Sequence, residues 1–279
     1  MASGAFPTQD IPEGSRIACR VEYDGGGYCG WQSQPGEDVP TVQDTLESAL
    51  GDVADRPVRV HCAGRTDTGV HAHAQVVHFD SPATRSPKAW VVGGNANLPP
   101  DVRLHWAVAV PHDFHARHSA LSRRYRYLVA NTPVRPGLQR DRLTWHRRVL
   151  DEAAMDRAAR ELWGERDFSA FRAASCQSAS PMRNVHFARV ARRGDLVVLD
   201  IEANAFLHHM VRNIAGALLA VGDGREGEDS IAQLLAGRDR TLAADTAPAH
   251  GLYLVDVAYT AACGLPETPP GPDFLDIGP

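Results

Sequence analysis

Short segments in which apolar and polar residues alternate constrain the fold of this chain more than any other feature of its sequence. In the clearest segment, residues 102–110, every second residue is large and apolar, which is the period of a β-strand with one buried face. Arg193-Gly194-Asp195 separates two such segments and predicts a hairpin turn between antiparallel strands. The same alternation predicts further half-buried strands at residues 17–23, 58–62, 77–79, 122–130, 184–192, 196–202 and 252–259.

Helical spacing of apolar residues appears between the strand segments. A helix is predicted to begin at Thr41 and to continue through Val53, and Pro87 after Ser86 predicts the first turn of another. Two more are predicted at residues 151–162 and 206–221. Because the helices are set apart from the strands, we expect an α+β fold: two similar α/β halves joined through a mostly antiparallel sheet of about eight strands, with helices packed on it. The expected divisions are an N-terminal extension (1–15), an N-terminal α/β domain (16–112), a C-terminal α/β domain (113–262) and a disordered Pro- and Gly-rich tail (263–279).

The cysteines and the apolar runs indicate the compartment. The five cysteines are odd in number, widely spaced and without a CxxC pair, which disfavours a disulfide framework and a structural zinc site. No apolar run approaches the roughly 20 residues that span a bilayer. We therefore expect a soluble, cytoplasmic protein.

Positive charge is concentrated in one stretch of the chain. Residues 114–148 contain nine arginines and one acidic residue, Asp141, so this stretch carries +8 in a chain whose net charge is −5. Aromatic and imidazole side chains lie among the arginines, a mixture that binds phosphates and stacks on bases. The stretch predicts an RNA-binding surface, with an ordinary solvated face as the alternative.

The strongest local pattern runs from Cys62 to Ala72, between two strand segments. Arg65 and Asp67 lie two residues apart within it, flanked by Gly64 and Gly69. In an extended or looped segment such residues project toward the same side, so a cation and a carboxylate can share one concave site. A structural ion pair between them would have the same sequence pattern.

This block resembles the signature of the TruA family of tRNA pseudouridine synthases. Further matches occur in the family's order along residues 16–260, which is far more of the chain than a short pattern recurring by chance. They include Tyr23-Asp24-Gly25, Gly30-Trp31-Gln32, Asn95-Ala96-Asn97-Leu98-Pro99, Phe114-His115-Ala116-Arg117, Arg124-Tyr125-Arg126-Tyr127, Asp167-Phe168, His208-His209-Met210-Val211-Arg212-Asn213 and Gly251-Leu252-Tyr253.

The resemblance implies isomerisation of uridine to pseudouridine at positions 38 to 40 of the tRNA anticodon arm, by a homodimer, without a metal or an organic cofactor. Asp67 matches the catalytic carboxylate, which either attacks the sugar C1′ or removes a sugar proton. Arg65 is expected to help fill the space left by the flipped nucleotide. Tyr125 matches the tyrosine that stacks on the uracil, although a tyrosine in an alternating strand is ordinarily half-buried core.

The resemblance also implies substrate contacts and one ion pair. Arg212, whose default as a helix residue is solvent exposure, is expected to pair with Asp67 and keep it ionised. Gly216 on the same helix would let another backbone or the substrate approach closely. The chain departs from the family at Ala179, where a basic residue is usual. The expected substrate contacts are Phe114, His115, Ala116, Arg117, His118, Tyr125, Arg126, Arg85, Gln177 and Ser178.

Two other functions compete with this interpretation. His71, His73, His208 and His209 are the residues of a possible metal hydrolase, but adjacent His208 and His209 would point about 100° apart on a helix and would be poor co-ligands. A tRNA-binding protein without catalysis would keep RNA affinity and release no C5 hydrogen from uridine. The carboxylate of Asp67 argues against this second alternative.

Overall fold

The structure is a computed structural model that describes residues 6–7, 9–34 and 36–272. The chain divides into two compact units. Among the described residues, unit 1 consists of those up to 121 and from 254 onward, and unit 2 consists of residues 122–253. This division falls nine residues after the boundary expected at 112, and the chain returns to unit 1 within the last long strand.

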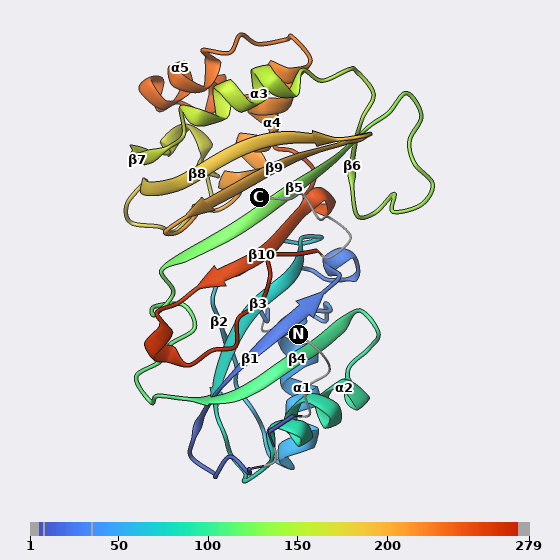
Figure 1. Cartoon of the computed structure of the whole chain (residues 1–279), viewed down its shortest axis with the longest axis vertical. Coiled ribbons are helices and arrows are strands. Elements are labelled where there is room, and N and C mark those ends of the chain that lie inside the picture. The colour runs from blue at the N-terminus through green and yellow to red at the C-terminus, as the bar shows by residue number, and fades with distance from the viewer. Residues whose placement is uncertain (1–5, 8, 35, 273–279) are drawn as a thin grey trace. The chain divides into compact units, whose positions relative to one another are not determined.

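Unit 1 is built on antiparallel strands with helices on one face. Strand β1 (Arg16–Tyr23) lies between β4 (Val102–Val110) and β3 (His71–Asp80), and the short β2 (His61–Cys62) also pairs with β3. Strand β10 (Leu252–Ala258), which enters unit 1 at Leu254, follows β3 in the sheet order. Helix α1 (Val42–Ala54) and a π-helical segment (Ala89–Gly93) that continues into α2 (Gly94–Asn97) lie behind these strands (Figure 1).

The helix starts of unit 1 are those that the sequence predicts. Thr41 caps α1 by accepting the backbone N–H of Asp44. Leu46 and Leu50 of the same helix are completely buried. Helical structure begins at Pro87, and the Ser86 hydroxyl accepts the N–H of Ala89. The cap and the fixed proline dihedral therefore define both starts.

Strands β1 and β3 are buried on both faces, not half-buried as the alternation predicts. Each of these strands lies between two other strands of the sheet. The second face of β1 carries the buried residues Ala18 and Arg20. The Arg20 guanidinium lies 2.7 Å from His73 Nε2 and also donates to the His73 carbonyl. A polar residue in these strands is therefore compatible with burial because it has a partner on the adjacent strand.

Unit 2 repeats the plan of strands backed by helices. Its sheet order is β5 (Ser122–Asn131), β9 (Leu196–Ala203), β8 (Met182–Arg193) and β7 (Gly164–Asp167), all antiparallel, with β6 (Thr144–His146) parallel to β5. The predicted hairpin is confirmed, since Arg193 pairs with Leu196 around Gly194. The helices are α3 (Glu152–Arg160), α4 (Met210–Gly222) and α5 (Ser230–Gly237).

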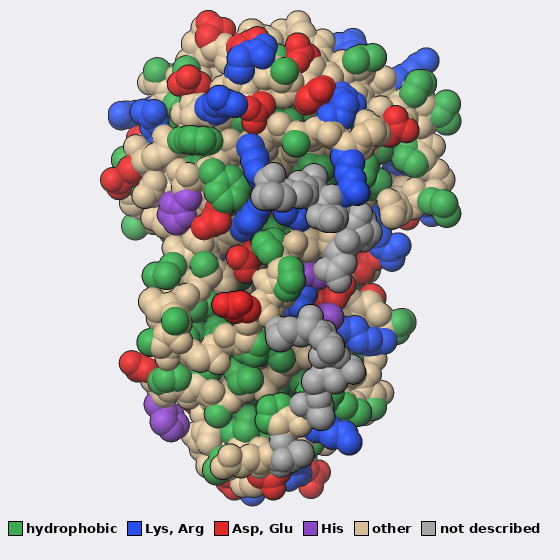
Figure 2. All heavy atoms as spheres, in the orientation of Figure 1, with side chains coloured by type: hydrophobic (Ala, Val, Ile, Leu, Met, Phe, Trp, Pro, Cys, Tyr) green, Lys and Arg blue, Asp and Glu red, His purple; other side chains and the backbone are tan. Residues whose placement is uncertain are grey.

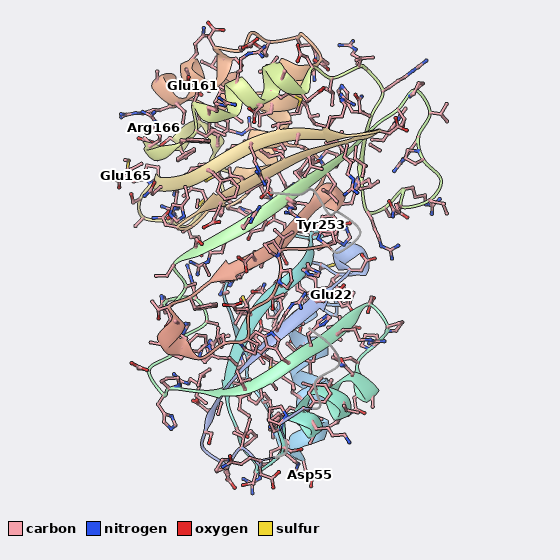
Figure 3. The ribbon with its side chains drawn as sticks, in the orientation of Figure 1. Glu22, Asp55, Glu161, Glu165, Arg166 and Tyr253 are labelled. Atoms are coloured by element: carbon pink, nitrogen blue, oxygen red, sulfur yellow. The ribbon has the colours of Figure 1, made fainter. Side chains whose placement is uncertain are left out.

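The remaining short elements connect these layers. One-turn 3₁₀ segments occur at Gly25–Gly27, Ser169–Phe171, Arg240–Leu242, Ala249–Gly251 and Ala261–Cys263. Tyr253 on β10 is labelled in Figure 3, and its hydroxyl donates to the Arg142 carbonyl. This hydrogen bond holds the long connection between β5 and β6. Together the two units confirm the α+β class with mostly antiparallel strand pairing.

Described residues near both ends of the chain pack against unit 1. Ile11 is buried and exchanges two backbone hydrogen bonds with Arg85. Near the other end Gly271 is buried, and its Cα lies directly against the His73 ring. The last part of the predicted tail, residues 273–279, lies outside the described residues. All five cysteines are free thiols, and no described helix is long and apolar enough to cross a bilayer.

Candidate active site

The loop that contains Asp67 is fixed from three sides by unit 1. It leaves β2 and enters β3 at His71. The fully buried Gln75 amide donates to the Gly64 carbonyl at 2.6 Å and accepts the Gly64 N–H at 3.3 Å. The Tyr23 hydroxyl forms a hydrogen bond of 2.7 Å with the Thr66 hydroxyl. The backbone N–H of Trp31 donates to the Thr66 carbonyl at 3.0 Å. The loop backbone is therefore preorganised before any substrate arrives.

Glycines let this loop pack tightly. Gly30 has φ +90°, and a Cβ there would lie 2.9 Å from the Thr66 carbonyl oxygen. Gly25 is closer still to the backbone of Val70. No larger residue fits at either position without moving the Asp67 loop.

Arg65 and Asp67 lie on the outer side of the loop, while Thr66 between them is buried. Arg65 is exposed, and within the described residues its side chain forms no hydrogen bond or ion pair. A structural Arg65–Asp67 ion pair is therefore wrong as an explanation of the motif. Asp67 is half-buried at the end of the tethered segment.

The two histidines after the motif already have partners in unit 1. His71 Nδ1 lies 3.0 Å from both the Asp24 carboxylate and the Gly25 backbone nitrogen. His73 Nε2 faces Arg20 as described above. Both imidazoles hold neighbouring strands and loops in place.

The Phe114–His118 loop is also held by unit 1. The Arg16 guanidinium donates to the carbonyls of His112 and Phe114, while His78 Nδ1 accepts the Ala116 N–H at 3.1 Å. Phe114 and Ala116 are buried, and Arg117 and His118 are exposed. Of the predicted contacts here, the exposed pair is therefore presented to solvent and the buried pair anchors the loop.

Imidazole rings of this loop and of the neighbouring strands β2 and β3 lie close together. His78 stacks on His61 with centroids 5.1 Å apart, and His115 lies 4.5 Å from His78 and 4.3 Å from His118. Burial, followed by the charges of His115, His61 and Arg16, lowers the pKa of His78 to about 4. Burial and the charge of His118 also lower the pKa of His115. Both rings are thus neutral at pH 7, and both Nδ1 atoms accept loop N–H groups.

Unit 2 carries Tyr125 and Arg212. Tyr125 on β5 is buried, and its ring meets Phe206 edge-on with centroids 5.1 Å apart. Its neighbours Arg124 and Arg126 lie on the opposite face of the strand, where both bind Asp200, so the expected division of faces is confirmed. Arg126 is itself buried, which argues against a phosphate contact for this residue.

The geometry assumed for His208 and His209 is wrong. Helix α4 begins at Met210, after His209 adopts a left-handed conformation with φ 59°. The two rings lie side by side with centroids 4.0 Å apart, instead of diverging around a helix. The left-handed residue breaks the helical repeat that the prediction assumed.

His208 also helps to hold the loop that contains Gln177 and Ser178, two of the predicted substrate contacts. Its carbonyl accepts the Ala173 N–H, and Ser175 Oγ lies 3.0 Å from its Nδ1. Arg172 bonds the carbonyls of Cys176 and Ser178. Burial raises the pKa of the Cys176 thiol, but the N–H groups of Ser178 and His208 and the charge of Arg172 outweigh it and lower the pKa overall.

Arg85, the remaining predicted substrate contact, has partners within unit 1. Arg85 bonds the carbonyls of Val53 and Thr84 in unit 1, so its guanidinium already stabilises the helix end. On the face shown in Figure 2, Lys and Arg side chains are interspersed with Asp and Glu. Sequence reasoning did not single out Gln75 or His78, because a polar residue in a buried strand gives no periodic signal of its partner.

Comparison with known proteins gives the class of this chain. The family model described as "tRNA pseudouridine synthase" matches residues 20–119 and 158–260. The matched segments include the Asp67 loop, the Phe114–His118 loop and helix α4. The folded units and their motifs are those of a pseudouridine synthase.

Full-length relatives narrow this class. The chain is 54% identical over 260 residues to "tRNA pseudouridine synthase A" of Legionella pneumophila (strain Lens), covering 93% of this chain and 98% of that protein. It is 55% identical to the protein of the same name from Vibrio cholerae serotype O1 (strain M66-2), with the same coverage. The chain belongs to the tRNA pseudouridine synthase A family and is an intramolecular isomerase that converts uridine in the anticodon region of tRNA.

One solved structure is a distant match. The chain aligns with a chain of the "Crystal Structure of a Cbf5-Nop10-Gar1 Complex" at 13% identity and a TM-score of 0.34. The alignment covers 73% of this chain and 45% of that one.

Proposed function

We propose that Asp67 is the catalytic carboxylate of the isomerisation and that the target uridines are at positions 38 to 40 of the anticodon arm. The observation that carries the proposal is the tethered loop: Gln75, Tyr23 and Trp31 fix its backbone, and Asp67 lies half-buried where it ends. A carboxylate held in this way has little freedom to lose when it reaches the transition state.

The reaction places specific demands on the site. The bond between uracil N1 and sugar C1′ breaks, the base turns, and a bond forms between C5 and C1′. The C5 proton leaves and N1 becomes protonated, so the product is an isomer of the substrate. Asp67 serves either as the nucleophile at C1′ or as the base that removes a sugar proton.

Arg65 suits the handling of the flipped nucleotide. Flipping a base out of a stem costs a few kcal/mol, which contacts to the vacated position must offset. An exposed guanidinium without a protein partner among the described residues can stack on a base or bind a phosphate without breaking an existing ion pair. We assign that role to Arg65.

Tyr125 and Arg212 complete the proposed machinery. Tyr125 would stack on the uracil with its position fixed by Phe206. Arg212 would pair with Asp67 and oppose the upward pKa shift that a dry pocket causes in a carboxylate. Arg117, His118, Gln177 and Ser178 would contact the tRNA, with Phe114, His115 and Ala116 supporting them. We further propose that the enzyme is a cytoplasmic homodimer.

The decisive experiment replaces Asp67 with asparagine. Asp67→Asn keeps the size of the side chain and removes its negative charge, so tritium release from tRNA labelled at uridine C5 should cease while tRNA affinity stays within about twofold. Asp52→Asn, on the exposed side of α1, is the matched control and should behave like the wild type. Turnover by Asp67→Asn near the wild-type rate would refute the assignment.

A further inference from the structure

The segment at residues 245–248 runs across helix α4 in unit 2 at the position of Gly216. A Cβ at Gly216 would lie 2.0 Å from the Asp245 carbonyl oxygen. The absence of a side chain at Gly216 therefore allows this backbone to lie against the helix. Of the two occupants that the sequence left open at Gly216, another backbone or the substrate, the backbone is the one found here. Pro248 is held as well, since its carbonyl accepts the Tyr127 hydroxyl at 2.8 Å.

The same segment holds Arg212 at two points. Arg212 Nε donates to the Ala247 carbonyl at 2.9 Å, and the Ala247 N–H donates to the Arg212 carbonyl at 3.1 Å. A guanidinium is planar, so a hydrogen bond from Nε to a fixed carbonyl restricts the plane and direction of the whole group.

A polar cluster next to Arg212 fixes Ala247 in turn. The Thr246 hydroxyl donates to Asn213 Oδ1 at 2.6 Å. The Arg240 guanidinium donates to both of these oxygens at 3.1 Å. Asn213 is only 1% exposed, and its Nδ2 donates to the Phe171 carbonyl at 2.8 Å, so a flip of its amide would disrupt three hydrogen bonds.

We propose that Thr246 is a positioning residue for catalysis, which acts through Ala247 to aim the Arg212 guanidinium. This rests on the proposed role of Arg212 in the chemical step. Asn213 accepts the hydrogen bond of the Thr246 hydroxyl and so fixes the position of the adjacent Ala247. The Ala247 carbonyl in turn accepts the hydrogen bond of Arg212 Nε. A misplacement of about 1 Å in a catalytic group can cost up to roughly a hundredfold in rate, so the loss of the Thr246 hydrogen bond should be visible in the rate of the chemical step.

The test compares three threonine variants. Thr246→Val removes the hydroxyl and keeps the shape, and we expect a fall of about tenfold in the single-turnover rate with tRNA affinity unchanged. Thr246→Ser restores the hydroxyl and should restore most of the rate. The control is Thr241→Val, since Thr241 is exposed and bonds Asp239 at 2.7 Å in the neighbouring 3₁₀ segment, and it should leave the rate unchanged.

A double mutant separates positioning from general destabilisation. In the Arg212→Lys background Nε is gone, so Thr246→Val should cause little further loss if it acts through that atom. A loss as large as in the wild-type background, or a normal rate for Thr246→Val alone, would overturn the proposal. Should Thr246→Val prove unstable, Arg240→Met removes the neighbouring donor and is judged by the same criteria.

The proposed function can fail separately from this inference. A normal single-turnover rate for Arg212→Ala would remove Arg212 from the machinery, whatever Thr246 does. A slow Arg212→Ala enzyme together with a normal Thr246→Val enzyme would leave the machinery intact and reject only the positioning role.

Discussion

Gly30 lies directly against Thr66 at the base of the Asp67 loop: a Cβ on Gly30 would sit 2.9 Å from the Thr66 carbonyl oxygen and 3.2 Å from Asp67 C and Thr68 N. The Trp31 N–H also donates to that Thr66 carbonyl. The position of the loop that presents Asp67 therefore depends on the missing side chain of Gly30.

We predict that Gly30→Ala lowers the single-turnover rate by tenfold or more, roughly the effect of displacing a reacting group by a fraction of an ångström. Gly36→Ala is the matched control, because Gly36 has φ +89° against +90° for Gly30, but a Cβ there would meet no heavy atom within 4 Å. Both variants carry the left-handed strain of about 1–2 kcal/mol, and only Gly30→Ala moves the loop. Equal rates in the two variants would show that the close approach is unimportant.

The regular part of the fold is predictable from the sequence where the periodicity is strong, as in β4 and α1. Strand β7 consists of Gly-Glu-Arg-Asp and has no apolar residue, so no periodic signal marks it. It forms because residues 182–185 of β8 offer it a row of backbone partners. Short edge strands of this kind depend on their neighbour and not on their own sequence.

The site shows the same limit. Asp67 stands out through its motif, but the Gln75 side chain that fixes Gly64 is eleven residues away in a strand with no unusual pattern. The hydrogen bond between His78 and Ala116 joins residues 38 apart. Such partners depend on which strands become neighbours, and a single sequence does not specify that at residue level.

The His78 ring predicts a dependence of stability on pH. Its pKa is about 4 in the folded protein against about 6.5 in the unfolded chain. The unfolded state therefore binds more protons between these values, so stability is fully present above about pH 6.5 and falls as the pH drops toward 4. We expect wild type to lose on the order of 1 kcal/mol from this group between pH 7 and 5.

His78→Asn tests this dependence, because Asn Oδ1 can still accept the Ala116 N–H but does not titrate. Urea unfolding at both pH values should show a smaller loss of stability in the variant than in the wild type. The change in the same direction expected from His115 is common to both proteins and cancels in the comparison. An identical loss in the two proteins would contradict the pKa assigned to His78.

Arg117 should contribute to tRNA affinity through its charge. It is exposed on a loop that Arg16 and His78 hold in place, and removing one bound phosphate lowers the slope of log affinity against log salt by nearly one. Arg117→Ala should therefore weaken binding and flatten that slope. Arg166→Ala, an exposed arginine on β7 that Figure 3 labels, controls for the loss of one positive charge. An unchanged slope in Arg117→Ala would point to an ordinary solvated face.

Asp200 should matter for stability and not for RNA binding. Its carboxylate is 2% exposed and accepts two hydrogen bonds of 2.7 Å from Arg124 and one of 3.1 Å from Arg126. The Arg189 guanidinium lies 3.9 Å away. Three cations thus share one buried anion on the face of the unit 2 sheet opposite Tyr125.

Asp200→Ala would remove the buried carboxylate that these guanidinium groups bind, and removing one partner of a buried pair typically costs about 3–5 kcal/mol. We expect a loss of that order in urea unfolding, whereas Glu165→Ala, on the exposed edge strand β7 (Figure 3), should change stability by less than about 0.5 kcal/mol. If Arg126 serves stability, Arg126→Ala will follow Asp200→Ala in losing stability and will keep the wild-type salt slope for tRNA. A reduced slope in Arg126→Ala with unchanged stability would instead assign Arg126 to a phosphate, because only a group exposed to the RNA can alter counterion release.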